Sequence, residues 1–163
     1  MTAQKTSVAS DGFGVAHATF SIERVYPQNP ARVFAAFAKT AAKRRWFVEG
    51  EGWEIFSYDL DFRVSGNEAA RFRFGDGPEM TFQAHYHDIV PDRRIVYSYH
   101  MTVGAAPLSA SLSTIELLAD GSGTRLVFTE QDAFFDAKDS VKSREAGTRE
   151  LLEKLGQDLA RAS

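Results

Sequence analysis

Between residues 58 and 132 the sequence repeats short stretches of alternating apolar and polar residues, separated by turn-forming residues. This pattern limits the possible folds more than any other feature of the chain. Tyr58, Leu60 and Phe62 alternate with charged residues, as side chains do on a strand with one buried face. Turn-forming residues recur at 65–67, 75–78, 91–92, 104–107 and 120–123. The segment therefore predicts a meander of six antiparallel strands.

The flanking segments add a strand and two helices. Residues 16–26 alternate in the same way and predict a first strand. Asn29 and Pro30 are typical of an N-cap and a first helical residue, and a basic run at 43–45 suits the C-terminus of that helix. A stripe of Leu152, Leu155 and Leu159 predicts a helix over 140–162. We therefore expect an α+β protein with seven strands in the order β-α-β6-α.

Length and composition predict a single domain. The chain has 163 residues, of which 44% are hydrophobic, and this is enough for one core. Residues 1–14 are small and polar and predict a disordered leader before a domain spanning 15–162. The leader lacks the apolar core of a signal peptide, and no run of apolar residues is long enough to span a membrane. We expect a cytoplasmic protein.

The charges and the missing cysteines exclude several classes. The net charge of −3 and the lack of a basic face argue against a nucleic-acid partner. Without cysteine there is no disulfide scaffold, thiolate metal site or cysteine nucleophile. No phosphate-binding loop or dinucleotide fingerprint is present, so no cofactor is predicted.

Two short turns predict how strands pair and which residues face inward. A tight turn at 91–92 sets Tyr86 opposite Tyr97, Ala84 opposite Tyr99, and Phe82 opposite Met101. A two-residue turn at 121–122 sets Leu117 opposite Leu126, Ile115 opposite Phe128, and Ser113 opposite Glu130. Extending these pairs across the 104–107 loop gives three rows. The rows are Tyr86-Tyr97-Ile115-Phe128, Ala84-Tyr99-Ser113-Glu130 and Phe82-Met101-Ser111-Asp132.

These rows grade from apolar to polar, and small residues in them leave space that a solid core would fill. The apolar stripe of the last helix, followed backward, reaches Thr148 and then Arg144 or Glu145, beside Gly147. Glycine is unusual inside a helix. A polar helix end over a polar end of the sheet predicts the mouth of a cavity.

Several segments resemble one known superfamily. They are 29–34 with Trp46-Phe47, then 61–66, 88–97, 123–131 and 144–148 leading into Leu151-Leu152. In order and spacing they resemble the START and polyketide-cyclase (SRPBCC) superfamily, closest to the single-domain branch named after the activator of heat-shock-protein ATPase. The resemblance implies the helix-grip fold, in which a sheet wraps around a long C-terminal helix and encloses a cavity. Relatives bind small molecules, catalyse cyclisations or bind a chaperone, so the fold alone does not choose a function.

The expected ligand is a small apolar or aromatic molecule held between the sheet and the last helix, and binding is favoured over catalysis. The residues expected to bind it are Phe62, Phe72, Phe82, Tyr86, Tyr97, Tyr99, Met101, Ser113, Phe128, Glu130, Arg144, Thr148 and Leu152. The alternatives are a cyclase- or hydrolase-like enzyme that uses Glu130 as acid or base, and a chaperone-interacting domain. The protein is expected to be a monomer or homodimer.

Three groups of residues allow two interpretations each. Glu130 with Arg144 or Tyr99 either orients a ligand or forms a salt bridge that ties helix to sheet. Trp46, Phe47 and Trp53 either gate the cavity or close the core. His85, His87 and His100 share one outward strand face, where we expect exposed side chains and no metal site.

Overall fold

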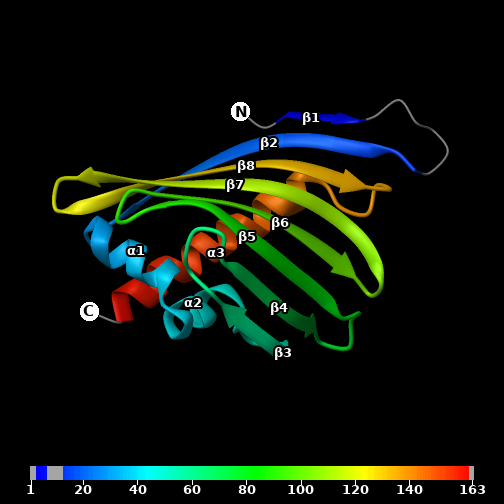
Figure 1. Cartoon of the computed structure of the whole chain (residues 1–163), viewed down its shortest axis with the longest axis horizontal. Helices are drawn as coiled ribbons and strands as arrows, with labels where there is room; N and C mark the ends of the chain where they lie inside the picture. Colours follow the sequence, from blue (N-terminus) through cyan, green and yellow to red (C-terminus); the bar gives the residue numbers. More distant parts are fainter. Residues whose placement is uncertain (1–2, 7–12, 162–163) are drawn as a thin grey trace.

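The computed structural model of the chain describes residues 3–6 and 13–161, which form one antiparallel sheet and three helices (Figure 1). The sheet has eight strands in the order β1-β2-β8-β7-β6-β5-β4-β3. The strands are β1 (Ala3–Thr6), β2 (Val15–Tyr26), β3 (Trp53–Leu60), β4 (Asn67–Phe74), β5 (Met80–Val90), β6 (Arg94–Val103), β7 (Ala106–Asp120) and β8 (Gly123–Phe135). The helices are α1 (Pro30–Ala38), α2 (Thr40–Phe47) and α3 (Val141–Arg161).

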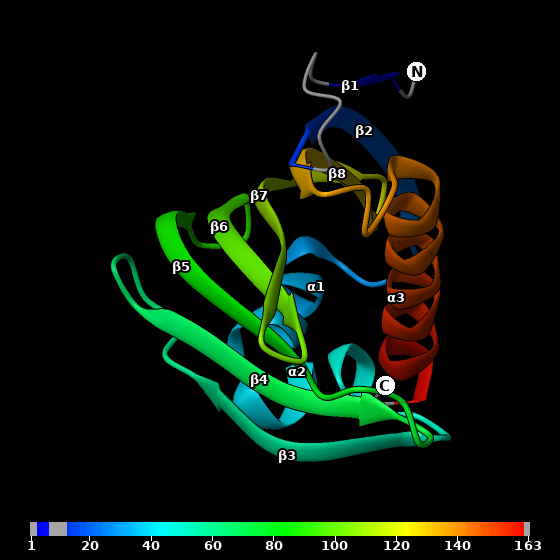
Figure 2. The same cartoon turned by 90° about the vertical axis from the view of Figure 1, so that its right-hand side faces the viewer.

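The seven predicted strands and the helix-grip arrangement are confirmed, although the first strand of the meander begins earlier than predicted, at Trp53, and ends at Leu60, so Phe62 lies outside it. The sheet curves around α3, and α1 and α2 pack beside the C-terminal half of that helix (Figure 2). The core lies inside this curve and includes the fully buried Phe20, Leu126 and Leu155. One strand was not predicted. β1, at residues 3–6, lies in the segment expected to be a disordered leader, and it pairs with β2. Residues 1–2 and 7–12 of that segment lie outside the described residues.

The first predicted helix is divided into α1 and α2. Lys39 has an extended conformation between them, with φ −92° and ψ 124°. No glycine or proline marks this break. It follows from packing: the Trp46 indole folds back onto Phe37, with ring centroids 5.0 Å apart, and its Nε1 donates to the carbonyl of Ala36 at 2.9 Å. That bond satisfies a carbonyl in the last turn of α1, so the chain can turn there.

Both predicted hairpin registers are confirmed, although one hairpin has a longer turn than predicted. Tyr86 pairs with Tyr97 and Leu117 pairs with Leu126. The first hairpin has a three-residue turn, 91–93, with Asp92 at φ 62°. An irregularity between Tyr86 and Asp88 offsets the extra residue and restores the predicted pairing.

The predicted rows across β6 and β7 are wrong by two residues. Tyr97 lies opposite Ser113, not Ile115, and Tyr99 lies opposite Ser111. The prediction placed Pro107 in a loop, whereas it lies in β7 beside a register irregularity, where a strand tolerates the missing N–H. A shift of two residues keeps every side chain on its predicted face. The inward face is therefore right, and only the neighbours between β6 and β7 in each row are wrong.

Candidate functional site

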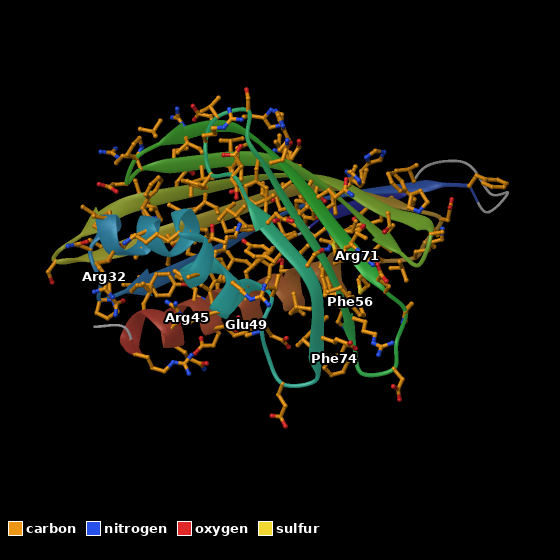
Figure 3. The ribbon with its side chains drawn as sticks, turned by 60° about the horizontal axis from the view of Figure 1, so that its bottom comes forward. Arg32, Arg45, Glu49, Phe56, Arg71 and Phe74 are labelled. Carbon is orange, nitrogen blue, oxygen red and sulfur yellow. The ribbon has the colours of Figure 1, made fainter. Side chains whose placement is uncertain are left out.

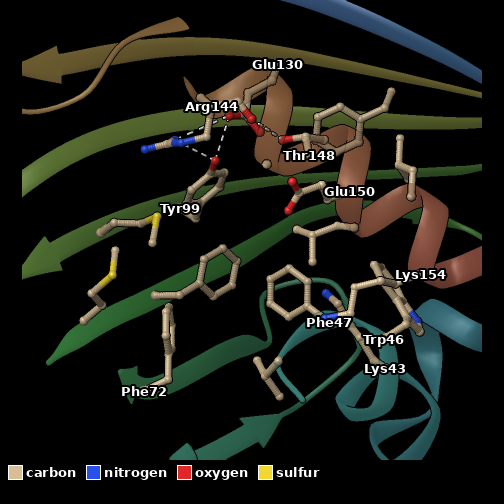
Figure 4. A pocket seen from close by; sticks show the side chains of 18 of the residues that line it. Lys43, Trp46, Phe47, Phe72, Tyr99, Glu130, Arg144, Thr148, Glu150 and Lys154 are labelled. Carbon is tan, nitrogen blue, oxygen red and sulfur yellow. Dashed lines mark hydrogen bonds and ion pairs between the residues drawn. The ribbon is translucent and has the colours of Figure 1, made fainter. Parts of the chain in front are cut away.

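A cavity of about 400 Å³ lies between the inner face of the sheet and helices α2 and α3 (Figure 4). The walls come from β3 to β8 on one side and from the two helices on the other. Pockets of this size accommodate small organic molecules. The side chains that set its character are Lys43, Phe47, Trp53, Phe72, Met80, Phe82, Tyr97, Tyr99, Met101, Leu108, Phe128, Glu130, Asp139, Arg144, Thr148, Glu150, Leu152 and Lys154.

Aromatic rings in mutual contact form most of the apolar wall. Phe82 of β5 is central, because its ring centroid lies 5.0 Å from that of Phe47 and 4.8 Å from that of Tyr99. Trp53 packs edge-on against Phe72 at 5.6 Å and is 39% exposed, which places it at the rim. Trp46 is buried, so it closes the core as well as contributing to the wall.

Glu130 is the centre of a buried polar cluster at the other end of the cavity. Only 1% of the residue is exposed. Tyr99 donates to its Oε1 at 2.7 Å and Ser113 donates to its Oε2 at 2.8 Å. The serine belongs to β7, between the strands that carry the tyrosine and the glutamate. Small serines on β7 thus leave room for a tyrosine to reach across one strand to a carboxyl.

Arg144 of α3 joins this cluster to the helix. Its Nη1 lies 3.5 Å from Oε1 of Glu130 and donates to the Tyr99 hydroxyl at 2.8 Å. Its Nη2 donates to Ser109 at 2.8 Å and to Asp139 at 3.1 Å. The salt bridge between helix and sheet is therefore present. Both of its partners also line the cavity, so the structural and ligand-orienting roles are compatible.

The electrostatics of the cluster favour a proton on Glu130. Burial, followed by the hydrogen bond and charge of Asp132, raises the pKa of Glu130 to about 8 against a usual 4.5. Burial, followed by the charge of Glu130, raises the pKa of Tyr99 well above its usual value. At neutral pH both groups therefore keep their protons and are able to donate hydrogen bonds.

A second buried polar group lies where the cavity meets α2. Lys43 Nζ donates to Glu68 Oε1 at 2.6 Å, and both residues are almost completely buried. Tyr86 donates to the same oxygen and Tyr58 to Oε2, each at 2.6 Å. The ammonium also lies 4.6 Å from the centroid of the Phe47 ring. Lys43 lines the cavity with its charge already matched by Glu68.

Ten of the thirteen residues expected to contact a ligand line the cavity. Three do not, and each has another structural role. Phe62 packs on Phe34 and Tyr86, Tyr86 bonds to Glu68, and Ser113 lies behind Glu130. The ten that line it are Phe72, Phe82, Tyr97, Tyr99, Met101, Phe128, Glu130, Arg144, Thr148 and Leu152.

Sequence reasoning missed Lys43, Glu150 and Lys154, which also line the cavity. The basic run at 43–45 was assigned to the helix dipole, whereas Lys43 turns inward and is buried. One signal was available: Glu68 shares a strand face with Ala70, so an inward carboxylate required a cation.

The histidines lie on the outer face, as predicted. His85 Nδ1 is 2.9 Å from Asn67 Oδ1, and His87 Nε2 is 2.7 Å from the Ser98 hydroxyl. Within the described residues no three histidine, aspartate or glutamate side chains form a group suited to a metal ion.

The fold and the cavity define a helix-grip protein of the SRPBCC superfamily. Within it, the chain belongs to the family described as Activator of Hsp90 ATPase homolog 1-like protein, whose family model matches residues 27–160. No curated protein matches the chain. Over residues 3–6 and 13–161, no helix is both long and apolar enough to cross a membrane.

Solved structures of three bacterial proteins share the fold. A Rhizobium loti protein is 56% identical, with a TM-score of 0.83 over 88% of this chain and 98% of its own. An uncharacterized Rhizobium leguminosarum protein is 38% identical, with a TM-score of 0.86 over 99% of both chains. A Chromobacterium violaceum protein is 27% identical, with a TM-score of 0.71 over 85% of this chain and 94% of its own.

Proposed function

We propose that this protein binds a small, largely apolar or aromatic molecule in the cavity between its sheet and α3. The observation that carries the proposal is the cavity of about 400 Å³, with aromatic walls and a polar end formed by Tyr99, Glu130 and Arg144. Apolar walls supply most of the affinity of such sites, and a few fixed polar groups orient the ligand. A cytoplasmic location and a monomeric or dimeric state remain predictions.

A melting-temperature screen tests this proposal. A ligand that binds only the folded state stabilises it by mass action, and at about 100 times its Kd the melting temperature rises by roughly 5–10 °C. The panel should contain lipids, phenols, aromatic amines and polyketides. If no compound raises the melting temperature, the proposal is wrong.

A pair of variants then locates the binding. A Cβ added at Gly147 meets no atom within 4 Å, and this residue lines the cavity. Gly147→Phe should therefore fill the space while the fold persists, and it should abolish the ligand-induced rise. Ala146→Phe adds the same ring one position away, outside the cavity lining, and should leave the rise intact. Equal responses from the two variants would contradict binding in this cavity.

Acid–base catalysis is a second candidate, supported by the protonated Glu130. An acid whose pKa lies near neutral pH, with Tyr99 bonded to it, is suited to proton transfer. Ser113 and Arg144 would then hold the carboxyl in place. Glu130→Gln should abolish turnover of any substrate found while retaining the fold. Turnover retained in that variant would remove Glu130 from the mechanism.

A chaperone-binding role is the third candidate and rests on the family description. The outer face near β3 and β4 carries the exposed Phe56 (Figure 3), whereas the exposed Phe74 lies on the other face, against Trp53 at the rim of the cavity, with ring centroids 5.0 Å apart. Phe56 lies 5.8 Å from the Arg71 guanidinium and 5.7 Å from that of Arg73, so charged groups flank this apolar side chain. A pull-down with Hsp90 tests this role, and no retention of the chaperone would argue against it.

A further inference from the structure

The guanidinium of Arg144 is already occupied by protein acceptors. Nη1 contacts the Tyr99 and Ser111 hydroxyls at 2.8 and 3.3 Å, and Nη2 contacts Ser109 and Asp139 at 2.8 and 3.1 Å. An arginine in a cavity usually indicates an anionic ligand, because its fork matches a carboxylate. Here a ligand carboxylate would have to displace Asp139 or a hydroxyl to reach it.

Carboxyl groups outnumber cations around this arginine. Glu130, Asp132 and Asp139 all lie within 3.5 Å of its nitrogens. Asp132 Oδ2 receives no hydrogen bond from the N–H and hydroxyl groups of the described residues. Three carboxyl groups therefore share one guanidinium, and a proton on one of them still leaves two carboxyl groups for a single cation. A buried surplus charge is unfavourable, so the site is suited to a positive partner.

The other charged groups of the cavity do not cancel this surplus. Lys43 is matched by Glu68 at 2.6 Å. Glu150 projects from α3 into the cavity (Figure 4) and forms no ion pair in the part of the chain that the structure describes. Lys154, one turn further along, donates instead to the backbone carbonyl of Glu49 at 2.8 Å. Glu150 and Lys154, although four residues apart on α3, therefore form no ion pair, and the Glu150 carboxylate is available to a ligand.

We propose that the ligand is a cation: a basic amine carried on an aromatic or apolar frame, with its ammonium group at the polar end of the cavity, between Glu150 and Asp139. This inference rests on the proposed function and narrows its ligand class. The frame would lie against Phe72, Phe82 and Phe47, whose ring faces also attract a cation. Neutral donors would bind more weakly, and carboxylic acids would be repelled.

Three compounds with one ring system test the charge preference. 1-Naphthylmethylamine, 1-naphthalenemethanol and 1-naphthoic acid share a frame and differ in their polar group. At neutral pH and low salt, titration calorimetry should give the amine a Kd at least about tenfold below that of the acid, with the alcohol between them. An acid that binds as tightly as the amine, or more tightly, overturns the inference and leaves the proposed function standing. If none of the three compounds binds, both the inference and the proposed function fail for ligands of this size.

A matched pair of charge variants locates the effect. Glu150→Gln removes an exposed carboxylate at the cavity, whereas Glu153→Gln removes one from another face of the same helix, where it pairs weakly with Arg24 at 4.0 Å. Glu150→Gln should weaken binding of 1-naphthylmethylamine about three- to tenfold and leave the alcohol unchanged. Glu153→Gln should change neither by more than about twofold. Equal effects of the two variants on the amine would mean that Glu150 does not contact it and would overturn its assigned place.

Discussion

Lys43 of α2 and Glu68 of β4 form an ion pair with Nζ and Oε1 2.6 Å apart, and their side chains are 3% and 0% exposed. Two tyrosine hydroxyls, those of Tyr58 and Tyr86, complete the acceptor capacity of the carboxylate. Removing two charges from water is costly, and this arrangement offsets the cost only while every member is present. The pair joins the second helix to the sheet at the inner end of the cavity.

Lys43→Met should destabilise the protein by about 3–5 kcal/mol, because Glu68 would keep a buried charge without its cation. The double variant Lys43→Met/Glu68→Gln should be more stable than Lys43→Met alone, since it removes the orphaned charge as well. Urea denaturation followed by circular dichroism measures both changes.

Arg44→Met is the control for this experiment. Arg44 pairs with Glu49 at 2.9 Å, but the two side chains are 40% and 45% exposed. Water screens such a pair, so its loss should cost about 0–1 kcal/mol. If Lys43→Met is no less stable than Arg44→Met, breaking the buried pair costs no more than breaking an exposed one, and the prediction is wrong.

The fold was predictable because local signals agreed with one another. Alternation identified the strands, Asn29 and Pro30 marked the start of α1, and the turn at Gly121 fixed the register of β7 against β8. The shift between β6 and β7 was not predictable, because it depends on Pro107 joining a strand beside an irregularity. The break at Lys39 follows from the packing of Trp46, which no local pattern encodes.

The candidate site was predictable only in part, for a related reason. The inward direction of Tyr99 and Glu130 follows from the two-residue period of a strand. Their hydrogen bond forms although the predicted pairing of β6 with β7 was wrong by two residues, because the tyrosine side chain is long enough to reach across β7. The occupancy of Arg144 by five hydrogen-bonding protein groups depends on tertiary geometry. The sequence alone therefore could not indicate that Arg144 is unavailable to an anionic ligand.

Glu130→Gln should flatten the dependence of stability on pH. Glu130 has a pKa of about 8 in the folded protein and a usual value of 4.5 when unfolded. The folded state therefore holds the proton more tightly, and this stabilisation is complete below about pH 4.5 and is lost as pH rises through 8. Glutamine mimics the protonated acid, so the free-energy difference between variant and wild type should move in the variant's favour by as much as ~4 kcal/mol from pH 5 to pH 8.

Urea midpoints measured at intervals across this window check the prediction. Glu79→Gln is a suitable comparison, because Glu79 lies on the surface and its hydrogen bond to Arg71 lowers its pKa. That substitution should not remove the fall in stability between pH 5 and pH 8. Parallel profiles for wild type and Glu130→Gln would show that Glu130 titrates normally in the folded protein.

Gly147→Ala and Gly156→Ala should have opposite effects although both residues lie inside α3. Alanine is favoured over glycine in a helix interior by about 0.5–1 kcal/mol. A Cβ at Gly147 meets nothing within 4 Å, so this substitution should gain that amount. At Gly156 the same atom would lie 3.1 Å from Cε1 of Tyr26, a buried ring whose hydroxyl is fixed by a bond to the Leu152 carbonyl. Thermal melts of the two variants should therefore move in opposite directions, and a loss of stability in Gly147→Ala would mean that this part of the cavity wall is packed rather than open.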